Sequence, residues 1–324
     1  MAHGKILGVD GDLTTPAGAP AGPVRWGVLL PTFDPLDVGT PPVVEAARLA
    51  EELGFDAAWA GDHLACPAPV LDSLCALSAA AAVTGRIELG VSVLQLALRH
   101  PAWAAKQLAT IDALAPGRLR LGVGAGGEYA DEYAAAGVAV QTRGRRLDEI
   151  LGVLPALLRG EPVSHAGPHA PVTVPGLRPA VSAVPRVSVG GRREASMRRA
   201  ARFGDQWLPM WLDPGAIRAA RRRLADLAAE HGRPAPSVGL LVLADIDDDP
   251  AKARSRCEEM TAGQYRMPFR VVDKWTAYGP AGHVAQMLRD YREAGVSEFI
   301  LMPTPHAPLV QYERLAELRD LVGR

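Results

Sequence analysis

The sequence predicts an α/β fold, a single (β/α)8 TIM barrel in which eight parallel strands alternate with helices. Two observations favour it. Short β-rich apolar runs alternate along the chain with segments of helical apolar spacing, and polar or glycine residues follow most of these runs. A length of 324 residues, 48% of them hydrophobic, is enough for one barrel-sized core. A doubly wound open sheet is the alternative that this pattern leaves open.

Four strands are predicted in the first half of the chain. Thr40 can cap the first helix, with Pro41 in its first position and Gly54 at its end. A further helix is predicted at residues 101–114, which carry apolar side chains at helical spacing. The strands are expected at residues 24–31, 55–60, 86–93 and 119–123.

The second half continues the alternation of strands and helices. Apolar residues at a period near 3.6 indicate a helix at residues 143–158. Four more strands are expected at residues 186–189, 205–210, 237–244 and 297–302. The remaining helices are expected at residues 194–203, 214–230, 250–261, 281–294 and 308–322.

Three stretches lie outside this alternation. Residues 1–23 are rich in glycine, proline and threonine and are expected to form a flexible leader, so that the barrel domain spans residues 24–324. Residues 160–185 are too long for a connection in a compact domain and predict an insertion over the C-terminal rim of the barrel, with a short hairpin. Residues 263–280 form a second irregular stretch.

Charge and cysteine content argue against several functions. The formal net charge is −1, so no basic excess indicates a nucleic acid or an acidic membrane surface as partner. Cys66, Cys75 and Cys257 form no C-x-x-C pair, which predicts free thiols and no structural metal. No apolar run is long enough to cross a bilayer, and residues 1–23 lack the apolar core of a signal peptide. We therefore expect a cytoplasmic protein with a small-molecule substrate.

One stretch resembles the strand 3 to strand 4 segment of the luciferase-like flavin oxidoreductase and monooxygenase superfamily: LGVSVLQLALRHPAWAAKQLATIDALAPGRLRLGVGAGG, residues 89–127. The elements LG, RHP, AKQLATID, GRL and GVGAG match together at their spacing. The likeness is greatest to the branch that uses the deazaflavin F420. It implies a barrel enzyme with F420 as its cofactor, or with FMN as the alternative.

His63 is the residue singled out for catalysis. It follows the second predicted strand in the motif WAGDHL, and an imidazole can donate to a developing negative charge or relay a proton near neutral pH. A local hydrogen bond to Asp62 would be the simpler interpretation. The motif is similar to the S/A-D-H-F/L motif of the F420 branch. That resemblance implies that His63 faces the reactive centre of the cofactor, and Asp62 its pyrimidine edge or His63 itself.

Two further motifs are expected to hold the cofactor. Ser92 and Val93 stand where the family has a bulge with a non-prolyl cis peptide beneath the cofactor ring, although the sequence alone does not show that bond. Gly190, Gly191 and Arg192 lie between a predicted strand and a predicted helix, where free N–H groups and the helix end can hold an anion. The resemblance implies that this turn binds the cofactor phosphate.

Other cofactor contacts are expected at strand ends, at Gly124 and Gly126 after the fourth strand and at Trp207 in the sixth. The run GVGAGG also invites a dinucleotide-binding interpretation. It lacks the third glycine of G-x-G-x-x-G, and no acidic strand end follows about twenty residues later, so we reject that interpretation.

The favoured function is F420-dependent hydride transfer to or from a small, fairly hydrophobic metabolite. The alternatives are an FMNH2/O2-dependent luciferase-like monooxygenase and a non-catalytic flavin-binding barrel. Residues 66–69 and Gly127 depart from the pattern of the sugar-phosphate dehydrogenase of this family, which argues against that substrate. A homodimer is expected from the resemblance. An apolar wall that suits a hydrophobic metabolite is predicted from residues 160–185 and 263–280, which include Tyr265, Met267, Phe269 and Trp275, with plain packing of these side chains as the alternative.

Overall fold

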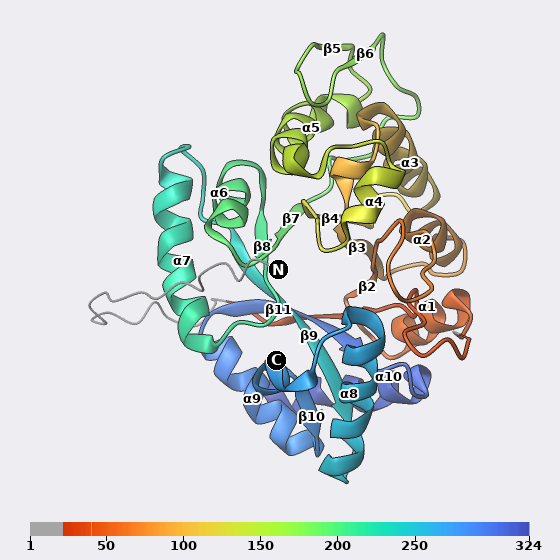
Figure 1. The fold of residues 1–324 in the computed structure, drawn as a ribbon, viewed down its shortest axis with the longest axis vertical. Helices are drawn as coiled ribbons and strands as arrows, with labels where there is room; N and C mark the ends of the chain where they lie inside the picture. The colour runs from red at the N-terminus through yellow and green to blue at the C-terminus, as the bar shows by residue number, and fades with distance from the viewer. Residues whose placement is uncertain (1–21, 40, 324) are drawn as a thin grey trace.

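The computed structural model describes residues 22–39 and 41–323, and these form a closed barrel of eight parallel strands surrounded by helices (Figure 1). Pairing of β8 with β9 closes the ring. The predicted (β/α)8 TIM barrel is confirmed, and the open sheet is excluded. The barrel strands are β1 (Arg25–Leu29), β2 (Ala57–Ala60), β3 (Glu88–Leu94), β4 (Leu119–Val123), β7 (Val187–Gly190), β8 (Gln206–Leu208), β9 (Ser237–Ile246) and β11 (Val296–Pro303).

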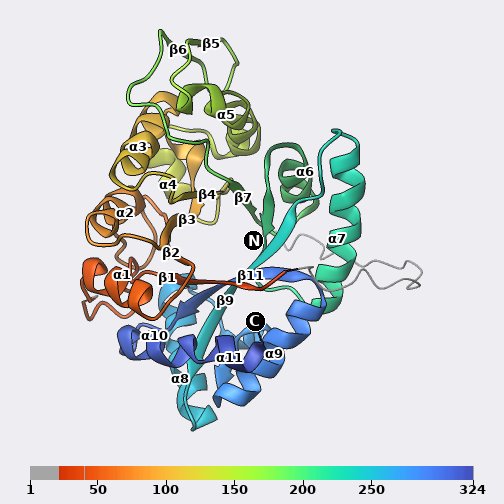
Figure 2. The ribbon, with the colours of Figure 1, turned by 180° about the vertical axis from the view of Figure 1, so that it is seen from behind.

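Helices cover the outside of the barrel, as both views show (Figures 1 and 2). Helix α5 buries six apolar residues on one face, and these are the residues whose spacing predicted the helix. The α-helices are α1 (Val43–Glu52), α2 (Ser73–Ala81), α3 (Pro101–Leu114), α4 (Ala130–Ala135), α5 (Arg143–Leu158), α6 (Glu194–Phe203), α7 (Pro214–Ala229), α8 (Pro250–Tyr265), α9 (Ala281–Glu293), α10 (Pro308–Ala316) and α11 (Leu318–Val322).

The start of the first helix differs from the prediction. Helix α1 begins at Val43 with Pro42 as its N-cap residue, so Pro41 is not its first helical residue. Two consecutive prolines explain the shift, because the residue before a proline is disfavoured in the α region. The proposed cap Thr40 and residues 1–21 of the predicted leader lie outside the described residues.

Two short helices, α2 and α4, were not located from the sequence. Helix α2 begins after Asp72, whose carboxylate accepts hydrogen bonds from the N–H groups of Leu74 and Cys75. Its residues are largely alanine, leucine and serine, so it lacks the polar face that marks an amphipathic helix. The predicted closing helix is also divided, into α10 and α11.

The insertion at residues 160–185 contains the predicted hairpin, formed by β5 (Val163–His165) and β6 (Val172–Val174). Its expected placement over the rim is wrong, since the hairpin lies along the outer side of α5 and α3 (Figures 1 and 2). The Glu149 carboxylate on α5 accepts from the N–H groups of His169 and Ala170. Asp112 on α3 accepts from the N–H of Ser182. These two carboxylates fix the insertion to the helices.

Residues 263–280 do lie beside the carboxyl ends of the strands. Strand β10 (Ala277–Gly279) pairs with the end of β9 and extends the sheet beyond the barrel. Tyr265 and Met267 pack on a cluster of side chains from inside the barrel that includes Ile300 and Met302. This stretch therefore forms part of the wall around the barrel mouth.

The barrel interior is filled by Trp59 and a buried network of charges. Cβ atoms added at Gly27 on β1 or Gly90 on β3 would lie 2.5 and 2.3 Å from atoms of the indole, so only glycine leaves room for it. Arg120 stands over the ring, 5.4 Å from its centroid, and donates to the buried Glu298 at 2.9 Å. None of the helices in residues 22–39 and 41–323 is long and apolar enough to span a membrane.

We predict that Arg120→Met lowers the free energy of unfolding by about 3 kcal/mol, because it removes the cation that is hydrogen-bonded to the buried Glu298 carboxylate and leaves only Arg25, at 3.9 Å. Urea denaturation measures the change. The matched control is Arg159→Met, which breaks the exposed ion pair with Glu161 and should leave stability nearly unchanged. Equal effects of the two substitutions would contradict a structural role for the buried network.

Candidate active site

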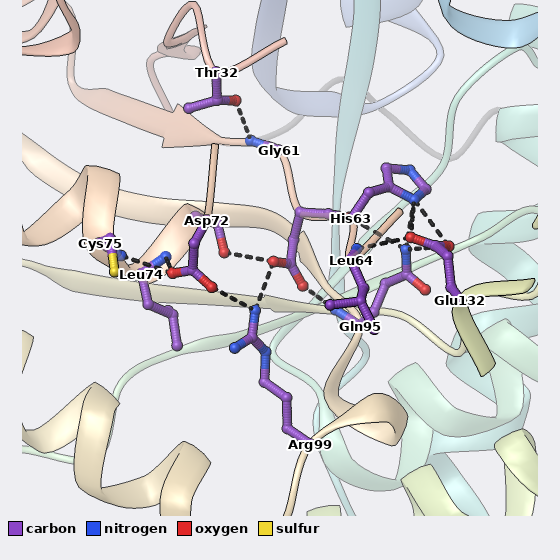
Figure 3. Close-up of polar contacts among 12 residues, drawn as sticks. Thr32, Gly61, His63, Leu64, Asp72, Leu74, Cys75, Gln95, Arg99 and Glu132 are labelled. Atoms are coloured by element: carbon purple, nitrogen blue, oxygen red, sulfur yellow. Dashed lines mark hydrogen bonds and ion pairs between the residues drawn. The ribbon is translucent and has the colours of Figure 1, made fainter. Parts of the chain in front are cut away.

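The candidate site lies where β1, β2, β3 and β4 end at their carboxyl termini. The N–H of Gly61 after β2 donates to Thr32 Oγ1 after β1 at 3.2 Å, which joins the first two strand ends (Figure 3). A Cβ at Gly61 would come within 2.0 Å of the Phe33 ring. The glycine therefore lets Phe33 pack against His63, with 5.8 Å between the ring centroids.

The hydrogen-bond partner of His63 is Glu132 on α4, which the sequence analysis did not identify. Nδ1 of the ring lies 3.0 and 3.1 Å from the two carboxylate oxygens (Figure 3). Oε1 also accepts from the N–H groups of Leu64 and Ala65, at 2.7 and 3.0 Å. Because an ionised carboxylate only accepts hydrogen bonds, the proton of the ring is on Nδ1 and points to Glu132.

Gln95 completes this arrangement from the end of β3. Its amide nitrogen donates to Glu132 Oε2 and to the carbonyl oxygen of Asp62, both at 3.2 Å. The same nitrogen lies 2.7 Å from His63 Nδ1, and because its two hydrogens are directed at these oxygens this approach is a contact between two donors and not a hydrogen bond. The Nδ1 side of the ring is thus enclosed, and Nε2 is the ring atom available for chemistry. Tyr129 packs edge-on against the ring, with 5.3 Å between centroids.

The pKa of His63 is raised above its usual value. Burial by itself lowers the pKa of an imidazole, but the hydrogen bond and the negative charge of Glu132 outweigh burial here. Glu128 adds a second negative charge, with Oε2 at 3.8 Å from His63 Nε2. The pKa of Glu132 is lowered, because the His63 hydrogen bond and the backbone N–H of Ala65 overcome the opposing effect of its burial. Both pKa shifts favour the charged form of the His63–Glu132 pair.

Asp62 is not the hydrogen-bond partner of His63, and its expected contact with the cofactor stays a prediction. One carboxylate oxygen accepts from Arg99 at 2.8 Å and from the Ser73 hydroxyl at 2.7 Å, and the other accepts from the N–H of Gln95 at 2.9 Å. The interpretation that Asp62 satisfies His63 is wrong, since Glu132 does so. The buried Asp62 carboxylate instead joins the loop after β2 to the end of β3 and to the start of α2.

The peptide bond between Ser92 and Val93 is cis, as the resemblance implies. The pairing of β3 with β4 shifts register between Val91 and Leu94, which is the expected bulge. Glycines surround the Val93 side chain, because Cβ atoms at Gly124 and Gly190 would lie 2.5 and 2.9 Å from its methyl groups.

Gly126 has a different neighbour from that of Gly124. Its φ is +56°, and an added Cβ would come within 2.2 Å of Gln95 Oε1. These glycines therefore allow close packing of the strand ends. Their contacts with a cofactor stay predictions.

The turn after β7 has the form expected of an anion site. Gly191 has φ +113°, a conformation that side chains disfavour, and Arg192 beside it is exposed. Helix α6 begins at Glu194, and the N-cap side chain of Arg193 makes no capping hydrogen bond within the described chain. The acidic Glu194 is itself paired, with Arg223 and Arg198 at 2.8 and 2.9 Å. The N-terminus of α6 can therefore attract an anion.

Trp207 is not at the barrel mouth. It is 1% exposed, belongs to the core beneath the surrounding helices, and its indole N–H donates to Ser196 Oγ of α6 at 3.3 Å. Within a strand, alternate residues face opposite sides, and the parity of Trp207 directs it outward. Trp211 is the tryptophan at the rim. It contacts Tyr265 with 5.0 Å between centroids, and Arg192 lies over its ring.

A family model described as luciferase-like monooxygenase matches residues 24–271. The chain belongs to the luciferase-like monooxygenase family. Within this family it is similar to the F420-dependent glucose-6-phosphate dehydrogenase of Nocardia farcinica, with 27% identity over 321 residues that cover 87% of this chain and 93% of that protein. It is also similar to the 4-hydroxyprotoasukamycin monooxygenase of Streptomyces nodosus subsp. asukaensis, with 32% identity over 206 residues that cover 59% of this chain and 54% of that protein.

A third relative is an uncharacterized protein of Mycobacterium tuberculosis, 32% identical over 168 residues. The matched region spans 52% of this chain and 58% of that protein. Among solved structures, an F420-dependent secondary alcohol dehydrogenase in complex with an F420-acetone adduct has a TM-score of 0.79, with 19% identity, and covers 94% of this chain and 100% of that one. A monooxygenase from Streptomyces bottropensis has a TM-score of 0.77 and 21% identity. The match covers 91% of this chain and 97% of that one. Both show that the luciferase-like fold is shared.

Sequence reasoning missed two residues of this luciferase-like site, Glu132 and Gln95. Glu132 lies in the first turn of a six-residue helix, too short to show a periodic pattern. A signal was nonetheless present, because three acids, Glu128, Asp131 and Glu132, follow the glycine run after β4. A carboxylate so close to a strand end is placed to meet residues from the neighbouring strand end.

We predict that Glu132→Gln lowers the pKa of His63, because the amide keeps the size of the side chain but removes its charge. The pKa is measured by NMR titration of the ring protons, assigned with His63→Ala. In the control Glu128→Gln the pKa should fall less, since Glu128 is 69% exposed and 3.8 Å away. A pKa unchanged in Glu132→Gln would contradict the charged pair.

The same pair makes a stability difference that depends on pH. Because the pKa of His63 is higher in the folded protein, its protonation stabilises the fold fully at pH values below about 6.5, the pKa of the imidazole in the unfolded chain. This stabilisation is lost as the pH rises through the pKa of the folded state. The lowered pKa of Glu132 stabilises the fold above about pH 4.3. The difference in unfolding free energy between the protein and Glu132→Gln should thus be greatest at about pH 5–6.5 and shrink at higher pH.

Proposed function

We propose that the protein is an F420-dependent oxidoreductase that moves a hydride to or from a small, fairly hydrophobic organic metabolite. The observation that carries this proposal is the His63–Glu132 pair, which leaves at the mouth of a luciferase-like barrel an imidazole with a raised pKa, whose Nε2 faces the exposed Glu128 at 3.8 Å without a hydrogen bond among the described residues. Relatives named as F420-dependent glucose-6-phosphate dehydrogenases support the choice of cofactor.

The residues at the barrel mouth fit such a cofactor. The Ser92 hydroxyl is buried and has no hydrogen-bond partner among the described residues, so a bound ring can supply one. The turn formed by Gly190, Gly191 and Arg192 and the start of α6 would hold its phosphate. Val93 would support the ring from the bulge in β3. The deazaflavin, when bound, supplies the donor or acceptor of the hydride.

The chain itself contributes a proton donor and a water-excluding wall. With Nδ1–H held by Glu132, protonated His63 donates from Nε2 to negative charge that develops on the substrate. Phe33 and Tyr129 both pack against the imidazole, and the His63 side chain is only 14% exposed, which limits access of water. Tyr265 and Met267 form the predicted apolar wall. Phe269 is 5% exposed and packs inside the wall, so it does not line the mouth.

An FMNH2/O2-dependent monooxygenase is the second candidate. It is favoured by the similarity to a 4-hydroxyprotoasukamycin monooxygenase, and the same imidazole would serve it. A non-catalytic flavin-binding barrel is the third candidate, and the charged His63–Glu132 pair argues against it. We also propose a homodimer in the cytoplasm, which mass photometry and cell fractionation can test.

We predict that purified protein quenches the fluorescence of F420 with higher affinity than that of FMN. Gly191→Asp should weaken this binding strongly, because it adds a negative charge and bulk to the phosphate turn. Gly232→Asp is the matched control, since Gly232 also has positive φ, at +62°, and open space around it. Tighter binding of FMN would favour the monooxygenase. Equal F420 affinity of the two variants would refute the phosphate site.

We further predict that His63→Ala lowers kcat by roughly two to four orders of magnitude, while the affinity for cofactor changes only a few-fold. The loss of one donor to developing charge is the physical reason. His231→Ala, at an exposed position after α7, is the control and should turn over normally. Steady-state assays and cofactor titration separate the two effects. Wild-type turnover in His63→Ala would mean that His63 only packs.

A further inference from the structure

A narrow pocket opens at the barrel mouth between the ends of β1 and β11, the inner face of α8 and the start of α10. The reaction proposed above does not use it. Leu29, Met260 and Met302 form its apolar floor, and it has room for roughly three water molecules. An unbranched chain end is therefore the shape of group that it admits.

The polar groups around this pocket accept hydrogen bonds. Gln264 is 5% exposed, and its Oε1 is buried without a partner among the described residues. The orientation of the amide follows from its neighbour, since the Tyr265 hydroxyl donates to Met302 Sδ and so accepts from Gln264 Nε2. The Thr304 hydroxyl donates to Asp245, which leaves only its acceptor sites for a ligand.

The backbone around the pocket reinforces this preference. Six of the fifteen lining residues are prolines, which have no N–H to donate. Asp34 also lines the pocket, 9% exposed, and its carboxylate accepts from the N–H groups of Val38 and Gly39. An incoming anion or carbonyl group would find few donors here. The prolines are Pro31, Pro35, Pro41, Pro303, Pro305 and Pro308.

The pocket is adjacent to the candidate active site. Phe33 lines the pocket and also contacts the His63 ring, with 5.8 Å between centroids. Tyr129 also packs against the His63 ring, and its hydroxyl donates to the backbone carbonyl oxygen of Gln264 at 2.9 Å. Phe33 therefore lies against both the pocket and the His63 ring, so the two sites share one side chain.

We propose that this pocket binds the end of the substrate remote from the reacting atom, and that it selects an unbranched apolar chain ending in a hydrogen-bond donor, a hydroxyl or an ammonium group. That the occupant is the substrate rests on the proposed function. The selection of a donor rests only on the pocket. An unpaired buried oxygen gains a partner from such a group, whereas an acceptor-only group would leave it unpaired and remove its own hydration.

NMR titration with butyl probes tests the selection without any cofactor. Protein labelled at the methionine methyl groups reports directly, because Met260 and Met302 line the pocket. We expect 1-butanol or butylammonium to shift both signals, with 1-fluorobutane binding roughly three- to tenfold more weakly and butanoate weakest. Gln264→Leu should remove this preference for the donor. Gln286→Leu, at an exposed position on α9, is the control.

Two comparisons decide what the result means. If butylammonium binds more tightly than 1-butanol and Asp34→Asn abolishes the difference, the donor is an ammonium group; equal binding of the two indicates a hydroxyl. Equal binding of 1-fluorobutane, or an unchanged preference in Gln264→Leu, overturns the proposal. The ring signals of His63 should move with those of Met260, and unmoved His63 signals would overturn the assignment of the occupant as substrate.

These outcomes are separate from those that test the proposed function. Probe binding with no binding of F420 or FMN would refute the oxidoreductase and leave the donor-selective pocket in place. Binding of F420 or FMN without shifts of the methionine signals would refute the donor-selective pocket and leave the oxidoreductase in place.

Discussion

The buried carboxylate of Glu132 is the constraint on which the geometry of the candidate site depends. Its side chain is excluded from solvent, and a buried carboxylate is tolerated only when its oxygens are paired. The partners come from His63, Leu64 and Ala65 after β2 and from Gln95 after β3, while Glu132 itself follows β4. One side chain therefore holds three consecutive strand ends in a single arrangement, and it sets the tautomer of the imidazole at the same time.

Space is the second constraint, and glycines meet it. Gly124 and Gly190 allow the strands on either side to close on Val93, and Gly61 admits the Phe33 ring beside His63. Deeper in the barrel, glycines on β1 and β3 admit the Trp59 indole in the same way. The short glycine-rich strand ends thus have a packing role that is independent of any cofactor. Their contribution to ligand binding would come from the exposed backbone of the turn after β7.

The strands and most of the helices were predictable, because a buried strand or an amphipathic helix leaves a local period in the chain. The errors fall where the period is absent. Helix α2 has no distinct polar face, α4 is only six residues long, and a pair of prolines delays the start of α1. The insertion at residues 160–185 was recognised as irregular, but its position follows from carboxylates on α3 and α5 that no local pattern connects to it.

In the candidate site, the sequence by itself placed His63, Ser92, Val93 and the glycine turn at Gly190 at or just past the ends of apolar runs, and the bulge at Ser92–Val93 was implied by the family resemblance. Only the tertiary structure decided how these residues are used. It paired His63 with Glu132, 69 residues away, in place of its neighbour Asp62. The side chains of a strand alternate between its two faces, and the position of Trp207 in β8 directs it outward into the core beneath the helices. Hydrogen bonds between distant segments depend on which strand ends the closed barrel brings together, and that proximity leaves no trace in local spacing.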